Sequence, residues 1–468
     1  MNVMKKILYY ILLIAVFSAC ESQLDITPKG KTVLGTVADL ETLLNQTYNL
    51  SGGPVEDLGV ICNESYSYMT NVSELLANKN TLEYAFLAYD EKVDRALLTP
   101  TDGRYSGIYK WINYMNVILD KLGDAEGDAG RKEVIEAEAR IMRAYLHWLA
   151  VNIYAAQYDE ATAEDAGGIA YVTDIDVFKQ KNKQTIAEVY EQILEDCSDA
   201  NIARLPDVAP NVSRGGKGWG NAVRAKVLMQ MKKYTEALPY ALKSLEYNGI
   251  IEDRSTGWSL PQHVQSNLMY IVGIVPGLPV GEVLSVETVG LFEPGDYVKD
   301  YTEGMMGDGS WSSMFGMMMG GVMGCAMYFD FSDVFVNAYG ITSDRMYYTA
   351  AECYIRTGKI DEGLELVDRV RARRIEGYEP FEGTAADEKA AMELLQKAKW
   401  IECLSTYENF FDCKRWNTEN DYKRTITRDF MTMDGSSYSY SLTPDSPLWI
   451  FPFPGDACSH NPSLTQNY

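Results

Sequence analysis

The clearest pattern of apolar and polar positions in the chain lies at residues 131–154. Apolar side chains recur there at spacings of four and three residues: Ile135, Ala139, Met142, Leu146, Leu149 and Ile153. This spacing places them in one stripe along a helix of about six turns, and Tyr145 and Trp148 widen the stripe. The pattern predicts a long amphipathic helix whose stripe faces the core.

Two further helical segments follow the same reasoning. Thr185–Ala200 reads as an amphipathic helix that begins at Thr185, and Glu188 completes a capping box three residues later. Ala391–Trp416 predicts another long helical stretch.

A weak internal repeat appears later in the chain. Ala225, Leu228, Tyr234 and Ala237 have the same mutual spacings as Ala351, Tyr354, Ile360 and Gly363. Each set fits a helix, a short turn and a second helix, with small residues where two antiparallel helices cross. The unit resembles the tetratricopeptide repeat of about 34 residues. The two copies are far apart, so long insertions must separate the helix pairs.

The segments 50–106 and 250–340 differ from the helical regions. They are rich in Gly, Ser, Tyr and Trp and show no sustained period. Long irregular segments in compact proteins usually carry function, so we expect binding there. The predicted layout has a helical scaffold at about 31–50, 105–250 and 341–417. Loop-rich, ligand-side segments occupy about 51–104 and 251–340, and a C-terminal tail covers 418–468. The expected fold class is dominated by α-helices, with tetratricopeptide-like helix pairs and long irregular insertions.

The N-terminal residues have the pattern of an export signal. Lys5 and Lys6 precede the apolar run Ile7–Phe17, which is too short to span a bilayer, and Phe17-Ser18-Ala19-Cys20 follows. A cysteine directly after a small-residue cleavage site reads as a bacterial lipobox. We therefore expect residues 1–19 to be a signal peptide and Cys20 to carry a lipid, tethering one body, 20–468, to a membrane. An ordinary signal peptide with a chance cysteine is the alternative.

Composition narrows the function classes. The net charge of −24 disfavours nucleic-acid binding, which needs basic patches. No later stretch approaches the apolar length of a transmembrane helix. The eight cysteines contain no C-x-x-C pair, so we interpret those after Cys20 as small buried hydrophobes, with one disulfide left open.

No catalytic or metal-binding motif is present. The three histidines, His147, His263 and His460, are far apart and form no H-E-x-x-H, and no G-x-S-x-G occurs. His147 lies in the predicted 131–154 helix and is expected to be packed or hydrogen-bonded. We expect neither an enzyme nor a resident cofactor or metal; a surface glycosidase has no motif in its favour.

Met305–Met327 contains eight methionines with glycines between them. The segment fits a soft contact surface, a thioether site for Cu(I), or a loop packed on the helices. The sequence leaves these three alternatives open.

Several blocks, in their order along the chain, resemble one known family. They are Cys20–Asp25 with Pro28 and Gly30, Asp39-Leu40 to Tyr48, Tyr105–Leu119, Glu138-Ala139-Arg140 with Arg143-Ala144-Tyr145, Phe410–Trp416, Pro452-Phe453-Pro454 and Asn461–Asn467. The combination resembles the SusD/RagB-like outer-membrane lipoproteins of Bacteroidetes nutrient-uptake systems. Before Phe410 only Glu402 of the usual pattern persists clearly, so the chain resembles a divergent member.

The resemblance implies a cell-surface lipoprotein that captures an oligosaccharide and delivers it to a TonB-dependent, SusC-like barrel. A peptide ligand, as in RagB-like members, and a lid or scaffold without its own ligand are the alternatives.

Sugar rings stack on aromatic side chains, so aromatic residues in the irregular segments are the candidate ligand contacts. They are Tyr66, Tyr68, Trp258 and Trp311, with Asn63 and Asp308 as polar partners. The alternative for each aromatic residue is a place in the core.

Overall fold

The computed structural model describes residues 34–50, 56–68, 70–176, 178–257, 263–272, 281–297, 299, 311–329 and 337–468. The predicted signal peptide and the lipidation site Cys20 lie outside these residues. Within them, no helix is both long and apolar enough to cross a membrane.

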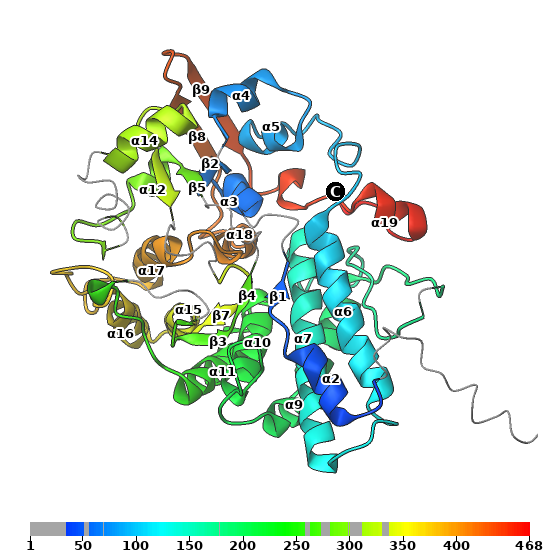
Figure 1. Cartoon of the computed structure of the whole chain (residues 1–468). Helices are drawn as coiled ribbons and strands as arrows, with labels where there is room; N and C mark the ends of the chain where they lie inside the picture. Colours follow the sequence, from blue (N-terminus) through cyan, green and yellow to red (C-terminus); the bar gives the residue numbers. More distant parts are fainter. Residues whose placement is uncertain are drawn as a thin grey trace, which may run out of the picture.

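One side of the molecule is built on two long antiparallel helices, α6 (Gly103–Lys121) and α7 (Ala129–Tyr154), which run side by side in Figure 1. Every residue of the predicted apolar stripe on α7 is buried, which confirms the helix expected at 131–154. Helix α2 (Val37–Leu44) packs on this pair. Helices α8 (Ile186–Asp196) and α9 (Asp199–Arg204) follow, and α8 begins with the predicted capping box of Thr185 and Glu188.

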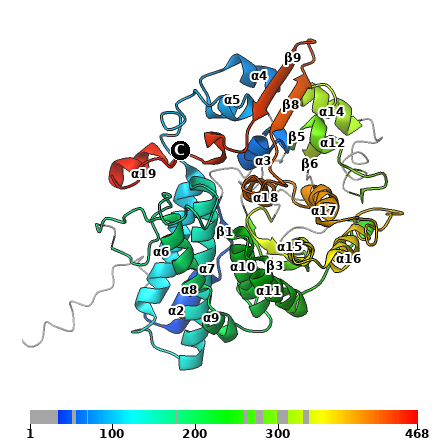
Figure 2. The ribbon, with the colours of Figure 1, turned by 180° about the vertical axis from the view of Figure 1, so that it is seen from behind.

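The internal repeat corresponds to two helix pairs that lie side by side in both views (Figures 1 and 2). Helices α10 (Lys217–Gln230) and α11 (Tyr234–Tyr247) form the first pair, and α15 (Ser343–Arg356) and α16 (Ile360–Arg371) form the second. Gly363 shows why a small residue is needed at the crossing. A Cβ atom at this position would stand 2.7 Å from the carbonyl oxygen of Ala351. The predicted helix-pair scaffold is confirmed.

The long helical stretch predicted at Ala391–Trp416 is wrong as one element. It is divided into α17 (Glu388–Glu402) and α18 (Glu408–Trp416). Ser405 interrupts it with a φ of 59°, in the left-handed region that a helix cannot continue through. The backbone N–H of Ser405 donates a hydrogen bond of 2.8 Å to the Glu64 carboxyl group instead of to a helical carbonyl.

The loop-rich half contains short helices and strands that no periodic pattern in the sequence predicted. They are α3 (Glu56–Cys62), β2 (Ser65–Tyr68), α4 (Val72–Ala77), α5 (Leu82–Leu87), β5 (Gly281–Leu284), α12 (Val286–Val289), α14 (Trp311–Gly320) and β6 (Ala326–Phe329). Strands β2, β5 and β6 form an antiparallel sheet in that order. A small separate core holds this half together, with buried residues such as Tyr66, Val283 and Phe430.

Short strand pairs join the two halves. Strand β1 (Tyr48–Asn49) pairs in parallel with β4 (Ile271–Val272), and β3 (Asn267–Met269) pairs with β7 (Ile341–Thr342). The 3₁₀ helix η2 (Arg254–Thr256) precedes β3.

The C-terminal tail returns across both halves. The hairpin of β8 (Ile426–Met431) and β9 (Ser437–Leu442) packs beside the small sheet, and η4 (Pro447–Trp449) and α19 (Gly455–His460) follow (Figure 1). Near its end, the Asn467 amide donates hydrogen bonds to the carbonyl oxygens of Tyr154 (2.8 Å) and Gly168 (2.9 Å). The tail is therefore an integral part of the fold.

Candidate ligand-binding site

A cavity of about 650 Å³ opens in the loop-rich half. It lies where α3, β2, α4 and α5 face the N-terminal end of α6 (Figure 1). The residues that line it are Asp57, Val60, Tyr66, Ser67, Tyr68, Thr70, Leu75, Asn80, Thr81, Leu82, Glu83, Phe86, Leu98, Thr99, Thr101, Asp102, Gly103, Arg104, Phe451 and Pro452. We call this space the large cavity. Its volume is within the range of about 300–1,000 Å³ typical of small-molecule sites.

Helix caps fix the polar groups of the large cavity. The Asp102 side chain caps α6 by accepting hydrogen bonds from the backbone N–H groups of Arg104 (2.8 Å) and Tyr105 (3.1 Å). The Tyr154 hydroxyl donates a third hydrogen bond to Asp102, of 2.6 Å. The Thr81 side chain caps α5 in the same way, through the N–H of Tyr84. The sequence therefore sets these side chains locally, before any ligand arrives.

An ion pair forms the polar floor of the large cavity. The Arg104 guanidinium donates two hydrogen bonds to the Asp57 carboxylate, of 2.6 and 3.2 Å, and lies 4.8 Å from the centre of the Phe451 ring. Burial raises the pKa of Asp57, and the charge of Arg104 opposes that rise. Because the guanidinium charge is already neutralised, the floor is polar without being strongly cationic.

Two of the predicted aromatic residues, Tyr66 and Tyr68, line the large cavity. Tyr66 is buried: its hydroxyl accepts a hydrogen bond of 3.0 Å from the N–H of Val286, and its ring lies 5.1 Å from that of Phe430. Tyr68, at the end of β2, is partly exposed. Tyr68 is thus the aromatic ring of this pair with surface available to a ligand, whereas Tyr66 mainly holds the wall.

The other predicted site residues are placed differently. Asn63 is buried, and its amide is engaged inside the protein: it donates to Glu287 (2.7 Å) and accepts from Arg428 (2.9 Å). The structure brings Asn63 to the interior rather than to the large cavity. Trp258 and Asp308 lie outside the described residues. Trp311 begins α14, but its side chain is likewise outside the described part.

Sequence reasoning missed most of the polar lining, including Asp57, Glu83 and Arg104. Arg104 and Asp57 are 47 positions apart, and no spacing rule connects them. The one available signal was local. Asp102 stands immediately before a helical pattern, as an N-cap residue does.

His147 is buried and structural, as expected. Its Nδ1 lies 2.8 Å from the carbonyl oxygen of Arg143 and its Nε2 accepts from the N–H of Val172 at 3.0 Å, which requires the proton on Nδ1. Burial lowers the pKa of this imidazole to about 3. Among the described residues, no group of three or more His, Cys, Asp and Glu side chains is arranged to hold a metal ion. The seven described cysteines are free thiols, and all except Cys458 are buried.

A cluster of exposed methionines marks another face of the loop-rich half. We call Met318, Met319, Met323, Met431 and Met433 the methionine patch; their exposed fractions run from 41% to 68%. Two backbone hydrogen bonds bring the segments together, from Met323 N to Met431 O (2.8 Å) and from Met433 N to Gly321 O (3.0 Å). Met327, by contrast, is buried. The described methionine side chains of this run are therefore divided between a packed part and an exposed apolar surface.

Comparison with known proteins places this arrangement in context. Residues 23–216 match a family model described as starch-binding and associating with the outer membrane, and residues 345–468 match the model of the SusD family. Together the two matches span more than half of the chain. No curated protein matches the chain in sequence at a significant level.

Solved structures share the fold at low sequence identity. A SusD superfamily protein from Bacteroides thetaiotaomicron is 16% identical with a TM-score of 0.71, and the match covers 92% of this chain and all (100%) of that one. A SusD-like carbohydrate-binding protein from Bacteroides vulgatus is 15% identical with a TM-score of 0.60, covering 93% and 98%. Another from Bacteroides fragilis is 14% identical with a TM-score of 0.61, covering 93% and 100%.

Proposed function

Because the chain belongs to the SusD/RagB-like family, as a divergent member, we propose that it binds an oligosaccharide at the cell surface and delivers it to a SusC-like, TonB-dependent transporter. The family is associated with the outer membrane. A lipid on Cys20 would supply the anchor, with residues 1–19 removed.

The large cavity is the observation that carries the proposal. It combines the partly exposed ring of Tyr68 with hydroxyl, amide and carboxylate groups from Ser67, Asn80, Thr81 and Asp102. Aromatic rings contact the C–H faces of a sugar, and planar polar groups bind its hydroxyls. The same combination of apolar wall and few placed polar groups is typical of small-molecule sites.

The charge of the large cavity favours a neutral ligand. Among its described lining residues, Arg104 is the one basic side chain, and it is paired with Asp57. Glu83 and Asp102 add further acidic groups. A uronate or sulfated glycan would meet net negative charge without a free cation to compensate it. We infer that the ligand is an uncharged oligosaccharide.

The methionine patch supports a protein partner. Exposed apolar clusters on soluble surfaces commonly mark interaction sites, and flexible methionine side chains adapt to a partner's shape. The acidic chain as a whole disfavours insertion of this patch among anionic lipids. In this proposal the patch contacts the barrel while the large cavity holds the cargo.

Calorimetric titration of the purified protein with neutral oligosaccharides tests the proposal. Binding that is weakened by Tyr68→Ala and unchanged by Tyr378→Ala, a partly exposed tyrosine outside the large cavity, is the expected result. Binding of short peptides in place of every glycan would favour the RagB-like alternative. Absence of binding to both classes, with retained association to a barrel, would favour the scaffold alternative.

A further inference from the structure

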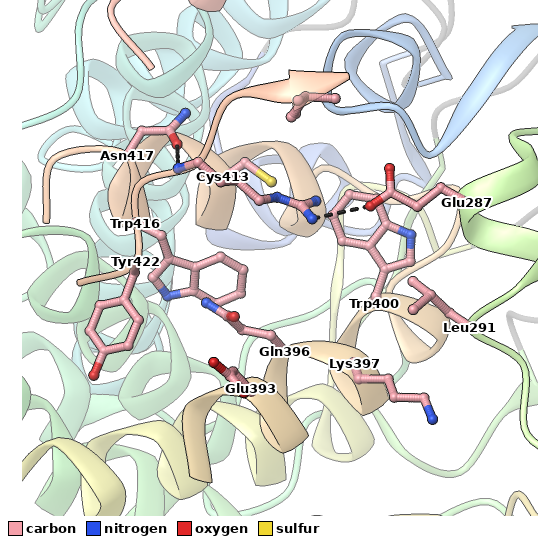
Figure 3. Close-up of a pocket in the computed structure, with 12 residues that line it drawn as sticks. Glu287, Leu291, Glu393, Gln396, Lys397, Trp400, Cys413, Trp416, Asn417 and Tyr422 are labelled. Atoms are coloured by element: carbon pink, nitrogen blue, oxygen red, sulfur yellow. Dashed lines mark hydrogen bonds and ion pairs between the residues drawn. The ribbon is translucent and has the colours of Figure 1, made fainter. Parts of the chain in front are cut away.

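A second, smaller cavity lies between the helical scaffold and the loop-rich half and shares no lining residue with the large cavity. Its volume is about 190 Å³, and Figure 3 shows it in close-up. We call it the α17 cavity. Four segments line it: α17, the end of α18, the α12 region and the loop that leads into β8. Its lining residues are Glu287, Leu291, Glu393, Gln396, Lys397, Trp400, Cys413, Trp416, Asn417, Tyr422, Arg424 and Ile426.

Helix α17 turns one face toward this cavity. Glu393, Gln396, Lys397 and Trp400 follow one another at spacings of three, one and three, which places them on the same side of a helix. The polar side chains of Glu393, Gln396 and Lys397 have no hydrogen bond or ion pair to any described residue. Three unengaged polar side chains at one cavity are available to a ligand.

The indole rings of Trp400 and Trp416 are fixed by hydrogen bonds to residues that do not line the cavity. The indole N–H of Trp400 donates to the Thr288 hydroxyl at 3.0 Å, and that of Trp416 donates to the Glu352 carboxylate at 3.0 Å. Both residues are more than nine-tenths buried, so only part of each ring borders the space. In Figure 3 the two indoles stand on different sides of the view, with Gln396 and Glu393 near Trp416. The cavity therefore has apolar ring surface and polar side chains together.

Asn417 lines the α17 cavity beside Arg424. Its Oδ1 accepts a hydrogen bond from the N–H of Arg424 at 3.5 Å. Its Nδ2 is buried and has no hydrogen-bond partner in the described part of the chain. Figure 3 shows this nitrogen turned away from the two indoles, so Asn417 forms part of the cavity wall.

The charges around the α17 cavity again favour a neutral ligand. The Arg424 guanidinium pairs with Glu287 at 3.1 Å and lies 5.7 Å from the centre of the Trp400 ring. Both members of this pair are about half exposed, so they border the opening rather than the buried end. Glu393 and Lys397 contribute opposite charges.

We propose that the α17 cavity is a second saccharide site, which takes a single neutral sugar ring. The ring's C–H surface would lie against Trp400 and Trp416, and its hydroxyls would bind Gln396, Glu393 and Lys397. The volume supports one ring rather than a chain, because it is below the range of about 300–1,000 Å³ of larger ligand pockets. The choice of a sugar rests on the proposed function.

The test uses the purified protein and four neutral monosaccharides: D-glucose, D-galactose, D-mannose and N-acetyl-D-glucosamine. Saturation-transfer NMR and the fluorescence of the tryptophans report binding. The informative variant combines Glu393→Ala and Gln396→Ala, since alanine favours a helix and neither side chain has a partner to lose. Lys389→Ala, an exposed residue one turn earlier on α17, is the matched control.

We expect at least one monosaccharide to bind, and its affinity to decrease at least tenfold in the double variant. Lys389→Ala should leave it unchanged. No binding by any of the four sugars, or unchanged affinity in the double variant, would each overturn the proposal. The proposed function fails separately, if oligosaccharides do not bind or if Tyr68→Ala has no effect on them.

Discussion

The buried carboxyl groups of Glu64 and Glu282 are bridged by one residue, Ser405, where α3, β5 and the turn before α18 meet. Glu64 accepts from Ser405 N (2.8 Å) and Asn409 Nδ2 (2.6 Å), and Glu282 accepts from the Ser405 hydroxyl (2.9 Å). Burial disfavours the charged form of a carboxyl group, and a second buried carboxyl group bonded to the same residue adds to this effect when both are charged. Through Ser405 and Asn409, the two carboxyl groups link the loop-rich half to the scaffold.

This pair predicts a decrease of stability toward neutral pH. Burial raises the pKa of Glu64 to about 7, so the folded state holds a proton that the unfolded state releases. The resulting stabilisation is complete below about pH 4.3, the ordinary pKa of glutamate. It decreases as the pH rises and is lost once the pH passes about 7. Its size is roughly 3 kcal/mol at most.

Glu282→Gln tests this assignment, because a glutamine removes the neighbouring acidic group and can still accept from the Ser405 hydroxyl. Urea unfolding from about pH 5 to about pH 8 should show the variant gaining stability relative to the wild type as the pH rises. Glu191→Gln, at an exposed position, should give a curve parallel to the wild type. A Glu282→Gln curve that is also parallel would show that Glu282 has no part in the raised pKa of Glu64.

Tyr66 and Tyr68 should separate stability from binding. Tyr66→Ala removes a buried ring and an acceptor for Val286, so the free energy of unfolding should decrease by about 3 kcal/mol or more. Tyr68→Ala should cost under about 1 kcal/mol in stability but weaken oligosaccharide binding about tenfold. Chemical denaturation and calorimetric titration measure the two effects. Equal stability losses in both variants would show that Tyr68 is a core residue.

The ion pair of Glu352 and Arg415 is fully buried. Neutralising its acidic member should therefore strongly decrease the free energy of unfolding. Arg415 donates to both Glu352 oxygens, at 2.7 and 2.8 Å. Glu352→Gln leaves the guanidinium without its full counter-charge, so the free energy of unfolding should decrease by about 3–5 kcal/mol. The exposed pair Glu365–Arg369 provides the comparison: Glu365→Gln should cost under about 1 kcal/mol. If the two variants lost similar amounts of unfolding free energy, burial would not be the reason for the importance of the Glu352–Arg415 pair.

The charge of the large cavity predicts selectivity between ligands. An oligosaccharide that contains uronic acids should bind at least about tenfold more weakly than a neutral one of equal length, and added salt should narrow the difference. Asp57→Asn removes one negative charge and part of the pairing of Arg104. It should therefore also narrow the difference in affinity between the neutral and the acidic glycan. Titration of the two glycans at two salt concentrations measures both effects. Preference for the acidic glycan in the wild type would contradict the neutral-ligand inference.

The methionine patch predicts an effect on partner binding alone. Met318→Ser combined with Met433→Ser changes exposed side chains, so stability and oligosaccharide affinity should stay near wild type. Recovery of the transporter barrel in affinity purification from membranes should decrease severalfold. Val208→Ser, at an exposed position on the scaffold, is the control and should have no effect. Undiminished recovery of the barrel in the double methionine variant would place the contact elsewhere.

The sequence revealed the parts of the fold that local spacing encodes. The stripe on α7, the capping box at Thr185 and the small residue at Gly363 each follow from helix geometry over a few turns. The same spacing could not show the break at Ser405, because its cause is the carboxyl group of Glu64, 341 positions away.

The candidate site was less accessible to sequence reasoning. Tyr68 could be proposed because it is an aromatic residue in an irregular segment, where sugar-stacking side chains are expected. The floor of the large cavity could not, since Asp57 meets Arg104 only once α3 has folded against α6. The hairpin of the C-terminal tail was also missed, although its strand β8 alternates buried and exposed residues. Its partner β9 alternates serine and tyrosine, but these tyrosines are only partly buried, and the buried face of β8 includes the charged Arg428.

The hydrogen bonds of Asn467 have a consequence for the order of folding. Asn467 binds the last carbonyl of α7 from a position 313 residues later in the chain. As the polypeptide emerges N-terminus first, α6 and α7 can pair early, but that carbonyl stays open until almost the whole polypeptide has been made. Truncation by only a few residues should therefore slow or prevent the final step of folding while leaving the early helical hairpin intact.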